Sequence, residues 1–222
     1  MTGRTPDRIR VASNTCADVF RRWTPGAPDP RFARRAPDEA LFLVLASHYP
    51  HKHLEFVPSV AEALARRTGR SFRFLLTIDP AGPGFAQIAA DAGRRGVGER
   101  VGTVGPLRLP DCPGAYAACD ALFLPTLLET FTASYPEAMQ MERPIVTSDL
   151  PFARDICADA AAFYAPLDAG DAAARLAELL ASEERRAALV AAGRRRLGQL
   201  LDSKGRADVV VDLLAYAARN GA

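Results

Sequence analysis

Short apolar runs alternate along this chain with longer segments in which apolar residues recur every three or four positions. The runs suited to buried strands are residues 41–46, 71–78, 100–105, 120–126, 144–148 and 161–166. Helical spacing is found at residues 54–67, 85–95, 113–119, 133–141, 171–182, 183–201 and 209–218. One more helix is expected to begin near Pro151, with Asp149 as its predicted N-cap. The alternation predicts an α/β fold: a doubly wound, parallel, Rossmann-like sheet with helices on both faces.

Residues 1–36 do not show this alternation. Four prolines, Pro25, Pro28, Pro30 and Pro37, rule out a continuous helix or a central strand there. We interpret residues 1–36 as a strand remnant around residues 8–14, followed by an interdomain linker. Trp23 either pins this linker to the domain or is exposed. Residues 37–222 then form the Rossmann-like domain with its C-terminal helices.

Composition and charge narrow the classes of function. The 222 residues are 49% hydrophobic and 24% charged, as in ordinary globular proteins. A net charge of +2 does not favour binding to nucleic acid or electrostatic binding to membranes. No apolar run approaches the ~20 residues of a transmembrane helix. The scattered cysteines lack zinc-site spacing. We expect reduced thiols and a cytoplasmic location, with peripheral attachment to the inner face of the membrane left open.

Three loops are candidates for the functional site. Ligands of parallel α/β sheets bind at the carboxyl ends of the strands, where loops lead into helix N-termini. That rule selects residues 47–53, 104–106 and 125–133, which can converge on one edge of the sheet.

The loop 125–133 combines hydroxyl groups with carboxylates. A helix N-terminus suits a phosphate, and Thr130 and Thr132 add hydroxyl donors beside its amides. Glu129 can accept hydrogen bonds from sugar hydroxyls, and Glu137, one turn into the helix, can reach ribose hydroxyls. The alternative is that Thr132 or Ser134 caps the helix and both glutamates sit in solvent.

The loop 47–53 holds His48, His51 and His53 together with Lys52. One hypothesis is a cationic cradle for a diphosphate, in which Lys52 supplies a fixed charge and His48 a donor. A metal site is a weaker alternative, since only Glu55 lies nearby as a carboxylate. A solvated polar loop is the third alternative. The chain has neither a dinucleotide-binding fingerprint nor a P-loop, so a nucleotide ligand would be held without a Gly-rich motif.

Residues 116–168 resemble the donor-side domain of GT-B retaining glycosyltransferases of the family-4 type. That family carries an E-x7-E motif, which Glu129 and Glu137 match. A PHK-N sequence after the first strand also recurs in it, and Pro50-His51-Lys52 matches, with His53 in place of Asn. The resemblance covers about residues 40–200, and weakly about residues 8–20. It implies that the chain is the C-terminal half of a GT-B architecture.

The resemblance also implies a task for each residue of the two loops. The substrate is a nucleotide-sugar donor, and neither a metal nor another cofactor is expected. Lys52 would contact the diphosphate, which the amides of residues 130–132 would cap. Glu129 would hold the donor sugar or support the developing oxocarbenium ion, and Glu137 would bind the ribose. Together with the loop chemistry, this predicts Glu129 as the catalytic residue and, for substrate binding, His48, Lys52, Thr130, Phe131, Thr132 and Glu137.

Two features depart from the family pattern. Thr130 and Thr132 stand where many members have Gly, and Ser47 and His48 stand where many have Arg, so diphosphate binding would depend more on Lys52. The chain also begins close to where an acceptor-binding domain would end.

We therefore expect a glycosyltransferase fragment that acts with an N-terminal acceptor domain in cis or in trans. A truncated reading frame, a subunit of a split enzyme and a non-catalytic nucleotide-sugar-binding or regulatory module are the alternatives. An epimerase of the same architecture ranks last.

Overall fold

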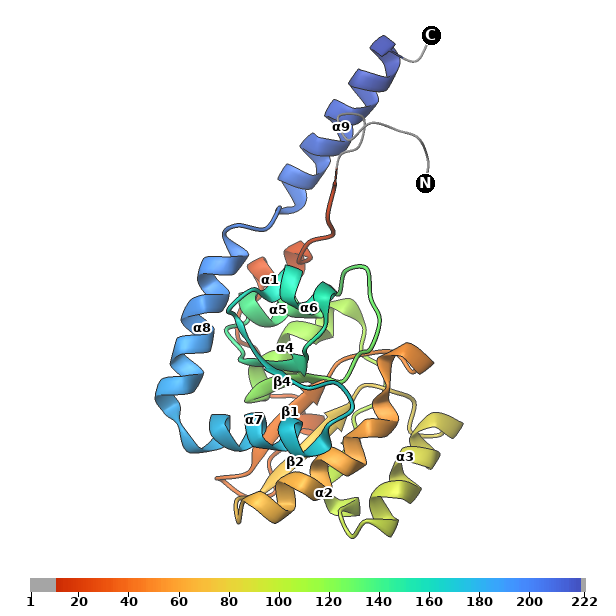
Figure 1. Ribbon diagram of the computed structural model, residues 1–222, viewed down its shortest axis with the longest axis vertical. Coiled ribbons are helices and arrows are strands. Elements are labelled where there is room, and N and C mark those ends of the chain that lie inside the picture. The colour runs from red at the N-terminus through yellow and green to blue at the C-terminus, as the bar shows by residue number, and fades with distance from the viewer. Residues whose placement is uncertain (1–10, 221–222) are drawn as a thin grey trace.

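The sheet has the predicted parallel α/β form. In the computed structural model, which describes residues 11–220, six parallel strands are arranged in the order β3-β2-β1-β4-β5-β6 (Figure 1). The strands are β1 (Ala40–Val44), β2 (Phe72–Leu76), β3 (Val101–Thr103), β4 (Ala121–Leu124), β5 (Ile145–Ser148) and β6 (Ala161–Tyr164).

The helices from residue 57 onward lie in the predicted segments, but the short helix at residues 18–22 lies in the segment interpreted as a strand remnant and linker. They are α1 (Asp18–Arg22), α2 (Val57–Arg67), α3 (Pro83–Arg94), α4 (Cys112–Ala118), α5 (Ser134–Gln140), α6 (Pro151–Cys157), α7 (Ala169–Ala181), α8 (Glu183–Leu197) and α9 (Ser203–Asn220). Five 3-10 turns lie between them: η2 (Pro30–Phe32), η3 (Pro50–Lys52), η4 (Leu54–Phe56), η5 (Gly98–Arg100) and η6 (Leu109–Asp111). One predicted cap is wrong: Leu150 is the N-cap of α6, while Asp149 pairs with Arg154 at 2.6 Å.

Both faces of the sheet are buried. Phe42 and Val44 point into one apolar cluster, which helices α2, α3 and α7 cover. Leu41 and Leu43 point the other way, into a second cluster that includes residues of α1, α4, α5, α6 and α8. Figure 1 shows these two sets of helices on opposite sides of the strands. Burial on both faces explains why the strands are continuous apolar runs rather than alternating ones.

The strand order places a topological switch point between β1 and β4. From β1 the chain proceeds outward through β2 to β3, and it then returns to β4 and proceeds the other way to β6. β1 and β4 are paired neighbours, with Phe42 opposite Ala121. Ligands of such sheets bind where the loops after these two strands diverge. The loops 47–53 and 125–133 therefore lie on either side of the switch point, whereas the loop 104–106 follows β3, the strand at the outer edge of the sheet.

The described part of the N-terminal segment packs against the domain. Cys16, Phe20 and Phe32 are buried in the second cluster, and the half-buried Trp23 packs against it. The strand expected around residues 8–14 falls partly outside the described residues, and residues 11–14 form no strand. The boundary between residues 36 and 37 stays a prediction.

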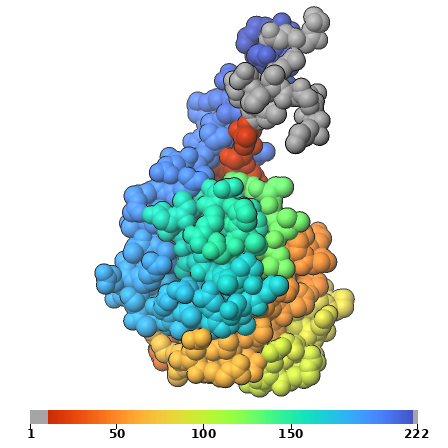
Figure 2. Space-filling model, viewed as in Figure 1, coloured from red at the N-terminus to blue at the C-terminus, as the bar shows by residue number. Residues whose placement is uncertain are grey.

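The C-terminal helices run along one side of the domain and then leave it. α8 packs against α5, and α9 projects from the rounded body (Figures 1 and 2). The base of α9 is tied to the N-terminal segment, since the Thr15 hydroxyl donates to the Leu201 carbonyl at 2.7 Å and the Ser203 hydroxyl to Asp18 at 3.0 Å. Between residues 11 and 220, no helix combines the length and apolar character needed to cross a bilayer.

A buried ion pair attaches the segment before β1 to the sheet. Glu39 is 2% exposed and accepts hydrogen bonds from Arg73 of β2 at 2.8 and 2.9 Å. It also accepts from the backbone N–H of Arg35 at 2.7 Å. Arg73 in turn donates to the Ala33 carbonyl at 2.7 Å. Residues 33–39 are thereby held against the amino-terminal edge of the sheet.

We expect Glu39→Ala to lower the free energy of unfolding by about 3–5 kcal/mol, because it leaves the Arg73 guanidinium buried without a counter-charge. Urea unfolding followed by circular dichroism measures the loss. Glu99→Ala is the matched control: its side chain is 91% exposed and pairs with Arg35, so little change is expected. Equal losses in the two variants would contradict this account of Glu39.

Candidate functional site

An ion pair between Lys52 and Glu129 spans the switch point. Lys52 is the last residue of the η3 turn, and Glu129 lies in the loop after β4. The Lys52 ammonium donates to Oε1 of Glu129, and the two side chains are only 15% and 17% exposed. Partial burial strengthens the attraction relative to a pair in water. The structure thus brings together the two charged residues on which the sequence-based hypothesis depends.

Local backbone chemistry explains how Lys52 reaches this position. Pro50, with its fixed φ, opens the η3 turn, and His53 closes it at φ 52° and ψ 42°. Asn, Asp and His are enriched in this left-handed conformation, which accounts for His53 at a position where the resemblance expects Asn. The backbone N–H of Leu127 donates to the His51 carbonyl at 2.8 Å. This hydrogen bond joins the two loops beside the ion pair.

Three consecutive backbone N–H groups of the loop after β4 lack an internal acceptor. Within the described part of the chain, no hydrogen bond uses the N–H groups of Thr130, Phe131 or Thr132. Thr130 is exposed, Phe131 is half-buried against the second cluster, and Thr132 is buried. Successive N–H donors in a loop form an anion-binding arrangement. An anion at this loop would therefore meet backbone donors beside the Lys52–Glu129 pair.

Neither candidate cap residue caps α5. The N-cap position is Ala133, without a side-chain hydrogen bond, and the Ser134 hydroxyl donates to the Leu45 carbonyl at 3.4 Å. The alternative that Thr132 or Ser134 caps the helix is therefore wrong. Ser134 instead links the start of α5 to the loop after β1, on the other side of the switch point.

Glu137 lies in the protein interior. It is 7% exposed, and its Oε2 accepts a hydrogen bond from the Tyr116 hydroxyl at 3.0 Å. Burial raises the pKa of Glu137 to about 7, although the Tyr116 hydrogen bond works in the opposite direction. No hydrogen bond or ion pair among the described residues joins Glu137 to Lys52 or Glu129. Both glutamates are therefore held by specific partners rather than sitting in solvent.

His48 is held on the α3 side of its loop. Its Nε2 lies 2.7 Å from Oε1 of Glu55, and its ring packs against Gly84 in the first turn of α3. A Cβ atom at position 84 would come within 2.5 Å of this ring, so the ring could keep this position only beside a glycine. The structure does not join His48 to Lys52 by a hydrogen bond.

The other two histidines have different neighbours. The His51 ring stacks on Tyr49, with centroids 5.7 Å apart, and the His53 ring stacks on Phe56 at 5.3 Å. Across residues 11–220, no group of three or more His, Cys, Asp or Glu side chains is arranged to hold a metal ion. The thiols are also unsuited to nucleophilic chemistry, because all four are buried and burial raises their pKa values.

Two features of the site carry no signal in the sequence. Tyr116 is 21 positions from Glu137, and its role as the hydrogen-bond donor depends on α4 packing beside α5. The Thr126 hydroxyl, directly after β4, is buried without a hydrogen-bond partner in the described structure. Both side chains are placed by tertiary packing, which local periodicity does not record.

A comparison with protein families gives a match over most of the chain. A family model described as "Glycosyl transferases group 1" matches residues 28–196, well over half of the chain. No curated protein sequence matches the chain significantly.

Solved structures share the fold. Sucrose-phosphate synthase from Thermosynechococcus elongatus has a TM-score of 0.75 and 20% identity, over 92% of this chain and 52% of its own. HepE from Anabaena, in complex with UDP and glucose, has a TM-score of 0.70 and 18% identity, over 80% and 48%. A mutant of TarM from S. aureus, in a complex that includes UDP, has a TM-score of 0.71 and 16% identity, over 79% and 35%. This chain thus spans about a third to a half of their lengths. The fold matches that of GT-B glycosyltransferases, as predicted.

The raised pKa of Glu137 predicts a pH-dependent stability. The folded protein binds this proton more tightly than the unfolded chain, so the free energy of unfolding falls as pH rises from about 4.5 to about 7. Glu137→Gln removes that dependence. Relative to the wild type, its free energy of unfolding should rise by as much as about 3 kcal/mol between pH 5 and pH 8.

Urea unfolding at several pH values measures this difference, with Glu142→Gln as the control. A hydrogen bond from Arg194 lowers the pKa of Glu142, so the contribution of its carboxylate to stability is lost only below the range of pH 5 to pH 8. The difference between Glu142→Gln and the wild type should therefore stay flat over that range. A difference between Glu137→Gln and the wild type that stays flat from pH 5 to pH 8 would contradict the assignment.

Proposed function

Because this chain belongs to the glycosyl transferases group 1 family, we propose that it provides the nucleotide-sugar-binding part of a retaining glycosyltransferase. In this proposal, a hexosyl group moves from a nucleotide-sugar to an acceptor. The observation that carries it is the Lys52–Glu129 ion pair at the switch point, beside three backbone N–H groups without internal acceptors. The Lys52 ammonium and the backbone N–H groups suit the diphosphate end of the donor. The Glu129 carboxylate beside them suits the hydroxyl groups of the sugar end.

The diphosphate binds between Lys52 and residues 130–132. When the donor binds, phosphate oxygens take the place of the Glu129 carboxylate as the partner of Lys52. The N–H of Thr130, an exposed residue, completes the cradle with those of the two residues that follow. This set of donors holds the diphosphate without a metal ion or another cofactor.

Glu129 then faces the donor sugar. When the bond between the anomeric carbon and the diphosphate oxygen breaks, negative charge develops on the diphosphate and positive charge at the anomeric carbon. The oxygen of the acceptor hydroxyl forms the new bond to that carbon, and the departing diphosphate takes up the hydroxyl proton. Lys52 and the loop amides stabilise the departing diphosphate, and one such fixed donor contributes on the order of 10²-fold in rate. Glu129 accepts hydrogen bonds from the sugar hydroxyls and offsets the positive charge.

Glu137 and His48 complete the proposed binding site. Glu137 binds the ribose hydroxyls as an acceptor, for which its ionised form is the better partner, and Tyr116 orients its carboxyl group. His48, held by Glu55 and Gly84, fixes the loop that carries Lys52. The two acids of one motif thus serve different parts of the donor.

An acceptor-binding part completes the enzyme, on the same polypeptide or on a separate one. Two facts support this part of the proposal. This chain aligns with only about a third to a half of the solved structures that share its fold. The chemistry described above accounts for a donor and for no acceptor. Sugar transfer by the 222-residue chain alone would argue against the alternative of a non-catalytic nucleotide-sugar-binding module.

Lys52→Ala should weaken the binding of nucleotide-sugars about 10- to 100-fold, since it removes a charge-assisted contact with the diphosphate. Isothermal titration with UDP-glucose, GDP-mannose and ADP-glucose identifies the donor and measures the loss. Lys204→Ala is the matched control, because Lys204 is the chain's other lysine and pairs with Asp208 on the exposed face of α9. Absence of binding by all three donors, or equal effects of the two substitutions, would refute the donor site.

Glu129→Gln should bind the nucleoside diphosphate of the preferred donor at least as tightly as the wild type does. The substitution replaces the anionic partner of Lys52 by a neutral amide. Less free energy is then needed to move the ammonium from residue 129 to the phosphates. Sugar transfer, assayed with an acceptor-binding partner, should fall by about 10²-fold or more. Titration with UDP, GDP or ADP provides the first measurement, and Glu142→Gln provides the control. Markedly weaker diphosphate binding in Glu129→Gln would contradict the exchange of partners at Lys52.

A further inference from the structure

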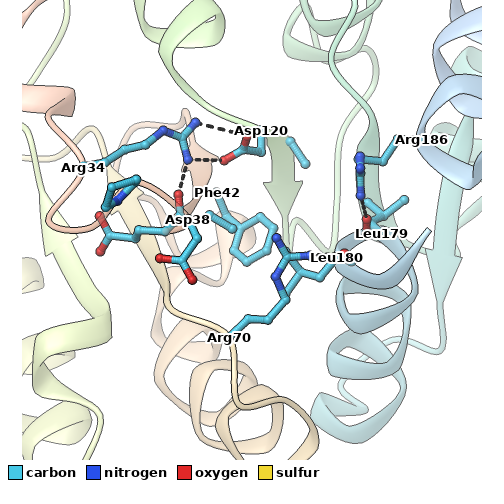
Figure 3. Close-up of a pocket in the computed structure, with 12 residues that line it drawn as sticks. Arg34, Asp38, Phe42, Arg70, Asp120, Leu179, Leu180 and Arg186 are labelled. Carbon is cyan, nitrogen blue, oxygen red and sulfur yellow. Dashed lines mark hydrogen bonds and ion pairs between the residues drawn. The ribbon is translucent and has the colours of Figure 1, made fainter. Parts of the chain in front are cut away.

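A cavity lies at the amino-terminal ends of β1 and β4, the opposite end of these strands from the Lys52–Glu129 pair (Figure 3). Its volume is about 410 Å³, and its lining includes Ala40 and Ala121, the first residues of β1 and β4. Because β1 has five residues at roughly 3.3 Å each, about 13–16 Å separates the two edges. The cavity shares no lining residue with the proposed donor site. A cavity of this size lies in the range of about 300–1,000 Å³ that small-molecule sites occupy.

Three arginines from separate segments line this cavity. Arg34 comes from the segment before β1, Arg70 from the turn between α2 and β2, and Arg186 from α8 (Figure 3). Arg34 is neutralised by Asp120 at 2.8 Å, and Asp120 also accepts the N–H of Leu41. The segment around Arg34 is the one that the buried Glu39–Arg73 pair holds in place. The lining of the cavity is therefore built by tertiary structure rather than by one flexible loop.

Arg70 and Arg186 have carbonyl groups as partners rather than carboxylates. Arg70 donates to the Leu180 carbonyl and Arg186 to the Leu179 carbonyl, both at the end of α7. Among the described residues, no ion pair joins either guanidinium to an acid. Carbonyls at a helix C-terminus carry only partial negative charge. Each guanidinium has five N–H donors, so most of its donor capacity remains.

The remaining lining combines a buried apolar base with one carboxylate. Phe42 lies at the centre of the cavity in Figure 3, with Leu179 and Leu180 on one side and Asp38 on the other. Phe42 and Leu179 are only 1% and 2% exposed, so they close the base of the cavity. Asp38 is exposed and can accept hydrogen bonds from hydroxyl groups.

We propose that this cavity is a second ligand site, which binds a small organic phosphate bearing hydroxyl groups. Arg70 and Arg186 hold the phosphate, and Asp38 accepts a hydroxyl. A phosphate monoester carries a charge of about −1.5 to −2 at neutral pH, which matches two guanidinium groups without acidic partners. A carboxylate carries a single charge and is satisfied by one bidentate guanidinium, so it is the poorer match.

The first test uses the unmodified chain and glycerol 3-phosphate, followed by NMR and isothermal titration. Amide shifts are expected at residues 38–42, 120–121 and 179–180, and none at residues 127–132. Binding should persist in Lys52→Ala, which separates this site from the proposed donor site. Glycerol should not bind, and D-glycerate, which has a carboxylate in place of the phosphate, should bind at least ten-fold more weakly. Absence of binding by glycerol 3-phosphate, or shifts confined to residues 127–132, would overturn the proposal.

The second test uses variants of the two arginines. Arg70→Gln and Arg186→Gln should each weaken glycerol 3-phosphate binding by about ten-fold or more. Arg185→Gln is the matched control, since Arg185 is an exposed neighbour on α8 that does not line the cavity. Thermal unfolding shows whether each variant is folded. If the arginine variants unfold, the amide shifts that glycerol 3-phosphate causes in the unmodified chain decide whether it binds in this cavity. Folded arginine variants that bind as tightly as Arg185→Gln would refute the assignment.

Discussion

Burial of both faces of the parallel sheet is the constraint that places every polar group discussed above. Strand residues such as Leu43 and Phe123 have no exposed side, so a charged side chain cannot be carried on a strand face without an internal partner. Chemistry is therefore confined to the two edges, where strands give way to loops. The carboxyl edge carries Lys52 and Glu129. The amino edge carries the Glu39–Arg73 pair and the arginine-lined cavity.

The ion pair across the switch point follows from the same constraint. A lysine and a glutamate that are each mostly buried would be costly if either stood alone, because removal of one partner leaves a charge without compensation. In the structure the two side chains satisfy each other. Under the proposed function, a diphosphate takes over Lys52 while sugar hydroxyls become the new partners of Glu129. That proposal therefore implies a preference for a ligand that presents both groups over a bare phosphate or a bare sugar.

The two glutamates of the E-x7-E motif occupy different environments, in keeping with the separate tasks that the proposed function gives them. Eight residues carry the chain from a partly exposed loop at Glu129 into the buried first turn of α5 at Glu137. Glu129 has a cation as its partner, whereas Glu137 has the neutral hydroxyl of Tyr116 and a pKa raised by burial.

The sequence by itself determined the elements and their kinds, because helix and strand formation follow the local spacing of apolar residues. The six strands, the helices from α2 to α9 and the loops at the carboxyl ends of the strands were predicted, whereas α1 was not, and Lys52 and Glu129 lie on the expected loops. Only the tertiary structure decided which loops meet, since the order of strands depends on packing between distant segments. Lys52 and Glu129 are 77 positions apart, and Arg70 lies 110 positions from the carbonyl of Leu180. No local pattern encodes such contacts, and the buried hydrogen bond from Tyr116 to Glu137 exists only once α4 and α5 pack together.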